Sequence, residues 1–326
     1  MSTTATVIVP TLSGARLEPL LRSLAGRAPG AFQVLVFDNG SRDPRIAEAV
    51  RDLPGAELLR AESNLGFSRA VNLAAERAEG EALVLVNDDC TCDPGFVERI
   101  VAALDPGAGV VMAAGVMRDA WEPSRIDTAG IVLDHTLLGL DYLNGEPVAR
   151  LEEGVPDPVG PSGAAAAFDR NAFLEVGGFD ENLFAYWEDV DLVLRLRCQG
   201  ASCRLAAHAR GDHAHSATLS SGSARKDYLM GFGRGYLLRK WAVISPRRLS
   251  SVVTRELAIC AGQALVDRSM AGVRGRVHGW RTAPPTLGYP ANALPRSTPG
   301  LAATLVGRWR RRASLRGRGA NGSSGP

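Results

Sequence analysis

Short apolar runs alternate with longer amphipathic segments through the first hundred residues of the chain. β-forming apolar side chains fill residues 6–9, 32–37, 56–60 and 82–87, and leucines at helical spacing follow the first of these runs. A further run at residues 110–116 predicts one more strand. Because strands and helices alternate, the pattern predicts an α/β protein with a mostly parallel central sheet flanked by helices.

The periodicity fades after residue 117. Residues 118–161 predict irregular loops, which we interpret as part of an acceptor cleft. The small apolar residues 163–169 are expected to pack against the sheet. Later segments predict helices, at residues 171–176, 192–199, 228–241, 252–266 and 301–312.

Two acidic side chains follow the predicted strand at residues 82–87. The strand ends at Asn87, and Asp88 and Asp89 come directly after it. The carboxyl ends of strands in an open α/β sheet face the ligand crevice. Capping of the next helix is the alternative role, but Asp93, directly before Pro94, suits that cap better. We therefore interpret Asp88 and Asp89 as charge-binding residues, with a divalent cation held by hard oxygen ligands as the expected partner.

Asp38 occupies the same position at the end of residues 32–37. The following Asn39-Gly40 is also a strong turn signal by itself. Acids gathered at one sheet edge repel one another unless a cation or donor groups lie between them, and a nucleoside base or ribose offers such donors. Gly66 opens a predicted helix, where either free N–H groups meet a phosphate or an ordinary capped helix begins.

Residues 187–191, Trp-Glu-Asp-Val-Asp, open the predicted helix at 192–199. Acids in a first helical turn stabilise any helix through its dipole. The aromatic residues just before them would desolvate the acids, and desolvation raises a carboxylate pKa toward that of a useful base. Further along, His208, His213 and His215 lie within eight residues, which suggests a ligand or phosphate contact, although H-x-H alone is a weak metal motif.

Composition narrows the class of protein. The 326 residues are 45% apolar, enough for a large core in one or two domains. The sequence has no apolar run long enough for a membrane helix and no secretory signal at its start, so we expect a cytoplasmic protein. Its five cysteines form no C-x-x-C pair, which predicts reduced thiols.

Charge is distributed unevenly along the chain. Residues 225–326 carry 19 Lys and Arg against three acids, whereas residues 1–224 carry 18 against 32, a net charge of −14. This asymmetry suits an acidic catalytic body whose basic end rests on an anionic surface such as a membrane leaflet. Trp309 among arginines is typical of an interfacial anchor, with a nucleic-acid tail as the alternative.

Six short motifs between Val7 and about Trp241 together resemble the family 2 glycosyltransferases of the GT-A fold, in their rhamnosyltransferase-like branch. They are Val7-Ile8-Val9-Pro10-Thr11, Asp38-Asn39-Gly40-Ser41, Asn64-Leu65-Gly66-Phe67, Val86-Asn87-Asp88-Asp89, Gly177-Gly178-Phe179-Asp180 and Trp187-Glu188-Asp189-Val190-Asp191. The resemblance implies a Rossmann-like GT-A domain over residues 1–244. A helical basic region over 245–316 and a disordered tail over 317–326 complete the predicted organisation.

The resemblance also implies roles for individual residues. Asp189 is the expected general base, with Glu188 beside it, and Trp187 and Asp191 are expected on the acceptor side. Asp89 and His213 are expected to bind Mg²⁺ or Mn²⁺, with His215 as the alternative histidine. Donor binding is assigned to Pro10, Thr11, Asp38, Asn64, Gly66, Asn87 and Asp88.

The expected function is inverting transfer of a sugar to an acceptor hydroxyl. The donor would be dTDP-rhamnose or another dTDP- or UDP-sugar, and the acceptor a glycan or lipid-linked glycan of the cell envelope, handled on the inner face of the membrane. Nucleic acid is not an expected partner. Glycosylation of a small secondary metabolite and non-catalytic sugar-nucleotide binding are the alternatives. Two departures from the family pattern are Leu12-Ser13, in place of an aromatic residue and Asn, and Asn87, in place of the first acid of a D-x-D element.

Overall fold

The computed structural model describes residues 5–25, 31–214, 223–266, 268–284 and 287–294. The chain divides into two compact units. The first, here called the sheet unit, comprises residues 1–131, 141–184 and 188–216, and the second, the helical unit, comprises residues 132–140, 185–187 and 217–326. The predicted helix at 301–312, the predicted tail, Trp309 and His215 lie outside the described residues. The predicted domain boundary at residue 244 stays a prediction.

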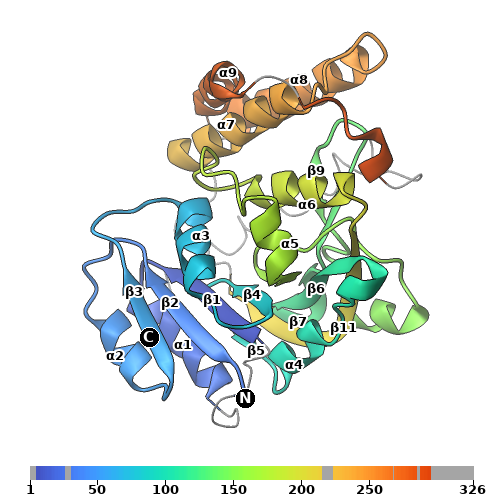
Figure 1. Ribbon diagram of the computed structural model, residues 1–326. Helices are drawn as coiled ribbons and strands as arrows, with labels where there is room; N and C mark the ends of the chain where they lie inside the picture. The colour runs from blue at the N-terminus through green and yellow to red at the C-terminus, as the bar shows by residue number, and fades with distance from the viewer. Residues whose placement is uncertain (1–4, 26–30, 215–222, 267, 285–286, 295–326) are drawn as a thin grey trace. The chain divides into compact units, whose positions relative to one another are not determined.

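The sheet unit is built on a nine-stranded sheet with the order β3-β2-β1-β4-β10-β6-β11-β5, in which β7 pairs with β6 (Figure 1). Four neighbouring strands near the N-terminus are parallel, as the alternating pattern predicted: β1 (Ala5–Thr11), β2 (Gln33–Asp38), β3 (Ala56–Arg60) and β4 (Ala82–Val86). Their apolar residues are buried on both faces in β1, β2 and β4, which explains runs without alternation.

The other half of the sheet mixes strand directions. Strand β10 (Ala165–Asp169) lies antiparallel between β4 and β6 (Val110–Asp119), and β11 (Ser202–His213) runs parallel to β6. Two short strands complete it, β5 (Cys90–Cys92) against β11 and β7 (Glu122–Thr128) against β6. The sheet is therefore mostly parallel, as predicted, with antiparallel strands inserted.

Two expectations about this half are wrong. Residues 163–169 do not merely pack against the sheet, because residues 165–169 form β10 within it. Residues 118–161 are not irregular, since they contain β7, the hairpin strands β8 (Ile131–Leu133) and β9 (Gly139–Asp141), and the 3₁₀ segment η2 (Val148–Glu153). The first part of β7 is exposed and polar, so pairing with β6 rather than apolar alternation creates that strand.

Helices cover both faces of the sheet. On one face the apolar sides of α1 (Gly14–Leu24), α2 (Arg45–Arg51) and α4 (Phe96–Val101) join one buried cluster with alternate residues of β1, β2 and β4. On the other lie α3 (Phe67–Arg77), α5 (Arg170–Glu175) and α6 (Glu188–Cys198) (Figure 1). There Phe168 and Phe179 contact Phe173 with ring centroids 5.6 and 5.5 Å away, which packs β10 against α5.

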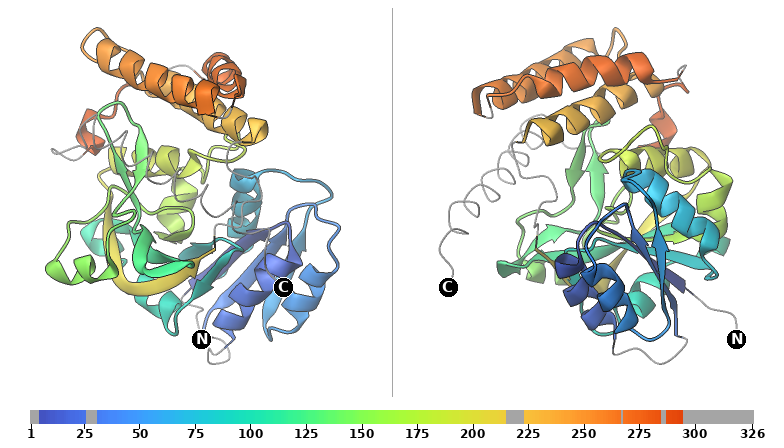
Figure 2. Two further views of the ribbon diagram at one scale, coloured as in Figure 1. Left: turned by 180° about the vertical axis from the view of Figure 1, so that it is seen from behind. Right: turned by 90° about the vertical axis from the view of Figure 1, so that its left-hand side faces the viewer.

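The helical unit contains α7 (Ala224–Lys240), α8 (Leu249–Val266) and α9 (Ala271–Thr282), which lie side by side (Figures 1 and 2). The sequence pattern does not predict α9, because the glycines of this helix weaken the helical periodicity. Those glycines let the backbones of α7 and α9 touch. A Cβ at Gly235 would lie 2.0 Å from the Arg276 carbonyl oxygen, and one at Gly279 would lie 1.9 Å from that of Phe232.

Two further expectations concern cysteines and membrane spans. All five cysteines are free, as predicted. Within the described part of the chain, no helix combines the length and apolar character that crossing a bilayer requires.

The contact between α7 and α9 makes a testable prediction. Gly279→Ala should lower the free energy of unfolding by about 1–3 kcal/mol, because the added methyl group forces the two backbones apart. Gly262→Ala is the matched control, since a Cβ at this α8 position meets nothing within 4 Å. Helix propensity alone should then raise stability by about 0.5–1 kcal/mol. Urea unfolding followed by circular dichroism measures both, and equal changes would contradict the close helix contact.

Candidate active site

The carboxyl ends of β1, β2 and β4 meet at one edge of the sheet, because these neighbouring strands are parallel. Thr11 is paired in register with Asp38, and its hydroxyl donates a 2.7 Å hydrogen bond to Asp88. Arg16 pairs with the same carboxylate oxygen at 3.0 Å. Burial raises the pKa of Asp88, against the opposing effects of Arg16 and Thr11. Asp88, predicted to bind donor, thus ties the end of β4 to β1 and α1.

Asp38 and Asn39 organise the neighbouring corner. Asp38 is buried, and its two carboxylate oxygens accept hydrogen bonds from the Ser41 amide (2.8 Å) and from Arg60 Nε (2.9 Å). The Asn39 side chain accepts from the Leu65 amide and donates to the Gly66 carbonyl. The corner after β2 is thereby fastened to the loop that opens α3.

The Gly66 loop differs from the expectation of free phosphate-binding N–H groups. The amides of Leu65, Gly66 and Phe67 donate to Asn39, Asn64 and the Phe184 carbonyl, respectively. Glycine is required here because φ is +87° and a Cβ would lie 2.5 Å from the Phe184 carbonyl oxygen. Of the two alternatives for this loop, free phosphate-binding N–H groups do not hold at these three positions, and Asn64 and Gly66 shape the loop. Pro10 and Asn87 remain predicted donor contacts.

Asp89 and His213 lie side by side because two strands are paired. Strand β5 begins directly after Asp89, and β11 ends at His213. Strand β5 starts at Cys90, which is paired with His213 at the end of β11. The Ala214 amide donates to the Asp89 carbonyl at 2.9 Å. This pairing brings Asp89 Oδ1 within 3.2 Å of His213 Nε2, and both side chains are largely buried. The two residues assigned to the metal are thus neighbours.

A third residue, Asp127 on β7, completes this group. Its Oδ2 lies 2.8 Å from His213 Nδ1 and accepts the proton of that nitrogen. Nε2 therefore faces Asp89 and is the nitrogen that would ligate a metal. Asp127 then has the role of the carboxylate that commonly orients a metal-binding histidine through its other ring nitrogen. Burial by itself would lower the pKa of His213, but its hydrogen bonds to Asp127 and Asp89 and the charges of both acids raise it to about 10.

The donor atoms fit a divalent cation. Asp89 offers a hard carboxylate oxygen and His213 an imidazole nitrogen, a combination suited to Mn²⁺ and compatible with Mg²⁺. A cation there would take the place of the Nε2 proton that the two carboxylates otherwise hold. Cys90 is near enough to be a third ligand, but burial raises the pKa of its thiol well above the usual value. We therefore leave the thiol out of the ligand set.

Asp127 was missed by the sequence analysis. It lies in the stretch interpreted as irregular, and it meets His213 because β6 pairs with β7 on one side and β11 on the other. The indication in the sequence was indirect, since a metal-binding histidine needs an acceptor for its second ring nitrogen. Which acid supplies it depends on the strand order. His208, another candidate, is exposed on β11.

Glu188 and Asp189 are the first two residues of α6, as the sequence predicted for an acidic first turn. The two residues before them, Tyr186 and Trp187, have φ values of 72° and 75°, a left-handed conformation that is strained for large side chains. Burial raises the pKa of both acids. The charge of Asp189 adds to the effect on Glu188, and backbone N–H groups of Val190 and Gly163 oppose the effect on Asp189.

Glu188 has an unusual carboxylate oxygen. The side chain is buried, and its Oε2 has no hydrogen-bond partner in the described part of the protein. An unsatisfied buried carboxylate oxygen is costly, and a hydroxyl donated by a ligand would satisfy it.

The start of α6 and the start of β5 both contact one short segment, residues 163–165. Asp189 accepts from the Gly163 amide, and the Cys90 thiol lies 3.9 Å from the Ala164 carbonyl. Ala165 is paired with Val86, the last residue of β4. Residue 189 is therefore connected through this segment to the strand end that carries Asp89.

Three expectations about neighbouring residues are corrected. Trp187, expected on the acceptor side, is buried in the helical unit and donates its indole N–H to the Met230 carbonyl. Asp191, also expected there, is fully buried in an ion pair with Arg195 at 2.8 Å. Asp93 does not cap α4, which begins after Gly95, but pairs with Arg118 at 2.7 Å.

Arg118 pairs on its other side with Asp212, at 2.6 Å. The single side chain of Arg118 thereby binds Asp93, directly after β5, and Asp212, directly before His213. The Asp93 carboxylate is used in that clamp, which leaves the first turn of α4 without a side-chain cap.

Comparison with known proteins identifies the fold and the family. Residues 6–145 match the model of glycosyl transferase family 2. The chain is 32% identical over 206 residues to the N-acetylglucosaminyl-diphospho-decaprenol L-rhamnosyltransferase of Mycobacterium tuberculosis, covering 56% of this chain and 66% of that protein's length.

Two solved structures share the fold. GalNAc-T7, crystallised with UDP, GalNAc and Mn²⁺, superposes with a TM-score of 0.58 at 15% identity, over 73% of this chain and 48% of that one. The mannosyltransferase PcManGT of Pyrobaculum calidifontis, in complex with GDP-Man and Mn²⁺, gives 0.52 at 17% identity, over 98% and 80%. The structure is thus of the GT-A class. Residues 6–145 thus match the family 2 glycosyltransferases, and the similarity to the mycobacterial enzyme supports their rhamnosyltransferase-like branch.

The role of Asp127 leads to a prediction about metal affinity. Asp127→Asn should weaken Mn²⁺ binding by about 10- to 100-fold, because His213 loses the carboxylate that orients it and increases its basicity. Isothermal titration of Mn²⁺ into chelator-treated protein measures this. Glu122→Gln is the matched control, since this exposed acid lies on the same strand, β7, but pairs with Arg125. Unchanged affinity in Asp127→Asn would show that His213 is not a ligand oriented by Asp127.

Proposed function

We propose that this protein transfers a sugar from a nucleotide-diphosphate donor to an acceptor hydroxyl with inversion at the anomeric carbon. The observation that carries the proposal is the pairing of two sites on one segment. Asp89 and His213, oriented by Asp127, suit a divalent cation, and the buried Glu188 and half-buried Asp189 are connected to them through residues 163–165.

Each residue has a distinct task in the proposed reaction. Asp89 and His213 Nε2 would hold the Mg²⁺ or Mn²⁺ ion, and Asp127 would keep the Nδ1 proton of His213 in place. When bound, the cation neutralises the charge of the departing diphosphate. Asp189 accepts the proton of the acceptor hydroxyl, for which a raised pKa is an advantage. Glu188 Oε2 accepts a hydrogen bond from the acceptor and orients it.

The proposed substrates follow from the family branch. We assign dTDP-rhamnose, or another dTDP- or UDP-sugar, as donor, and a lipid-linked glycan of the cell envelope as acceptor. The name of the mycobacterial relative, a rhamnosyltransferase acting on N-acetylglucosaminyl-diphospho-decaprenol, supports both assignments. Thr11 and Asp38 are the proposed donor-side contacts, because they lie in register at the ligand-facing edge of the sheet.

Replacing the base tests the proposal directly. Asp189→Asn should lower kcat by on the order of 10²–10⁴, the usual contribution of a general base, while donor binding persists. Donor turnover with a polyprenyl-diphosphate acceptor gives the rate, and titration with dTDP-rhamnose gives the binding. Glu181→Gln is the control, because Glu181 is an exposed acid of the same sheet unit. Full activity in Asp189→Asn would refute the base assignment.

The dependence of rate on pH provides a second test. A base with a raised pKa is protonated, and so inactive, at a higher pH than an ordinary aspartate, and kcat/KM should fall as pH falls through that raised pKa. The charge of Asp189 adds to the rise in the pKa of Glu188, whereas the raised pKa of Asp189 comes from its own burial, so Glu188 is still protonated while Asp189 titrates. Glu188→Gln should therefore leave this acidic limb in place. A pH profile of kcat/KM measures the limb, and a clear shift to lower pH would show that Glu188 is charged while Asp189 titrates.

A further inference from the structure

Helix α8 of the helical unit exposes a row of apolar side chains. Leu249, Val253, Leu257 and Leu265 recur at multiples of four residues, which places them along one inclined row of the helix surface. Leu257 is 65% exposed and Leu265 is 80% exposed. The neighbouring exposed positions hold uncharged residues, namely Ser250, Thr254, Ala258 and Ala261.

The charged residues of the same helix point inward instead. Arg255 is buried and pairs with the fully buried Asp134 at 2.5 Å. Glu256 pairs with Arg234 at 2.6 Å and with Arg276 at 2.7 Å. Burial would raise the pKa of Glu256, but the two arginines outweigh it and lower the pKa to about 2. The arrangement is the reverse of a helix that faces water, where apolar residues are inside and charges outside.

The charges around this row have one sign. The described acids of the helical unit, Asp134, Asp227 and Glu256, are all withdrawn from the surface by burial or ion pairs. The exposed charged side chains described in this unit are arginines, at positions 225, 247, 268, 274 and 281. Arg247 and Arg268 directly flank the two ends of α8 in the sequence. A surface that combines an apolar row with exposed arginines is complementary to the headgroups and upper acyl chains of an anionic bilayer. Two copies of this surface would repel each other.

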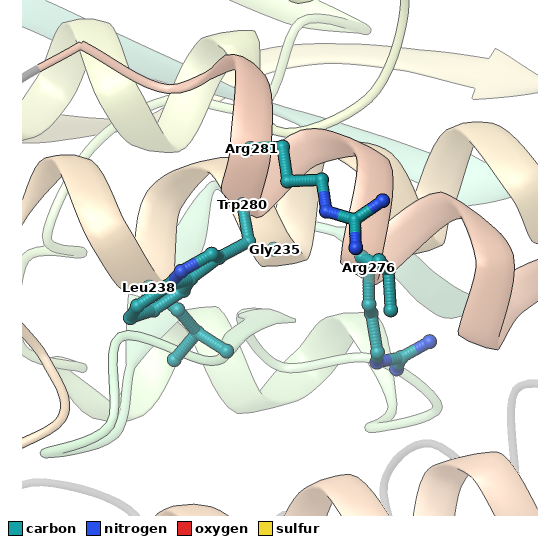
Figure 3. A pocket seen from close by; sticks show the side chains of 6 residues that line it. Gly235, Leu238, Arg276, Trp280 and Arg281 are labelled. Atoms are coloured by element: carbon teal, nitrogen blue, oxygen red, sulfur yellow. The ribbon is translucent and has the colours of Figure 1, made fainter.

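The same chemistry recurs between α7 and α9. An open hollow of about 220 Å³ is lined by Leu238, Val277 and Trp280, with Arg276 and Arg281 beside them. In Figure 3 the Trp280 and Leu238 side chains lie together, next to the two arginines. A partly exposed tryptophan close to arginines is typical of the membrane–water interface.

We propose that α8 is a membrane-contact helix, which lies in the interface of an anionic bilayer with Leu249, Val253, Leu257 and Leu265 among the upper acyl chains. The surrounding arginines then meet lipid phosphates. This contact goes beyond the proposed sugar transfer, and it holds the protein where a lipid-linked acceptor is found. Its test needs neither donor nor acceptor, so failure of the membrane contact and failure of the transfer are distinguishable.

Cosedimentation of the full chain with phosphatidylcholine–phosphatidylglycerol vesicles tests the contact. The wild-type protein should bind these vesicles, more weakly at high salt, and bind poorly to phosphatidylcholine alone. The double variant Val253→Gln/Leu257→Gln should lower the partition coefficient by roughly tenfold or more, because two side chains lose their apolar burial. Leu174→Gln is the matched control, since Leu174 is an exposed leucine on α5 of the sheet unit. Its binding should equal that of the wild type.

A second variant tests the cationic part independently. Arg247→Gln/Arg268→Gln should weaken binding to anionic vesicles by about fivefold for each arginine at low salt and reduce the salt dependence. Equal binding of the wild type and Val253→Gln/Leu257→Gln would overturn the proposal, as would absence of wild-type binding at low salt. A dimer in sedimentation velocity that Val253→Gln/Leu257→Gln dissociates, without vesicle binding, would assign the row to a second copy of the chain and also overturn it.

Discussion

The pairing of β5 with β11 is the constraint on which the candidate site depends. Asp89 and His213 are far apart in sequence, and neither has a local reason to lie near the other. The antiparallel ladder places His213 opposite Cys90, and the Ala214 amide closes it on the Asp89 carbonyl. Arg118 then holds Asp93 and Asp212 at the ends of the same two strands. Backbone pairing and one arginine therefore fix Asp89 and His213, the proposed metal ligands, before any ligand is bound, which is how a preorganised site avoids an ordering cost.

Acids crowd this edge of the sheet, and each one has a dedicated partner. Asp38 accepts from Arg60, Asp88 from Arg16 and Thr11, and Asp89 faces His213. Without these donors the carboxylates would repel one another or become protonated. The negative charges of these acids are compensated in two ways. Donor groups of the protein compensate Asp38 and Asp88, whereas the Asp89–His213 pair can exchange a proton for a cation. The geometry thus separates acids whose charge the protein itself compensates from the residue pair that could hold a cation.

The start of α6 shows a different use of constraint. Two left-handed aromatic residues lead directly into Glu188 and Asp189, and Trp187 is fastened in the helical unit by Met230 and stacked against Arg234 with its guanidinium 5.7 Å from the ring. The same Arg234 pairs with Glu256 of α8. Residues that the sequence suggested for substrate contact, Trp187 and Asp191, instead hold the segment in place. Strain at this position is stored by packing, and burial raises the pKa values of the two acids that follow it.

The sequence by itself determined the β-α repeat, the parallel strands β1 to β4 and the placement of acids at their carboxyl ends, because these depend on local periodicity and on parallel pairing. It also determined the family, through six ordered motifs. Tertiary structure alone decided that β10 enters the sheet and that β7 carries Asp127 to His213. It also decided that the Gly66 amide donates a hydrogen bond within the protein. It decided as well that the charges of α8 point inward and its leucines outward. These features arise from pairing between segments that are distant in the sequence. Local periodicity does not predict a polar edge strand, a glycine-rich helix or a helix whose apolar face is exposed.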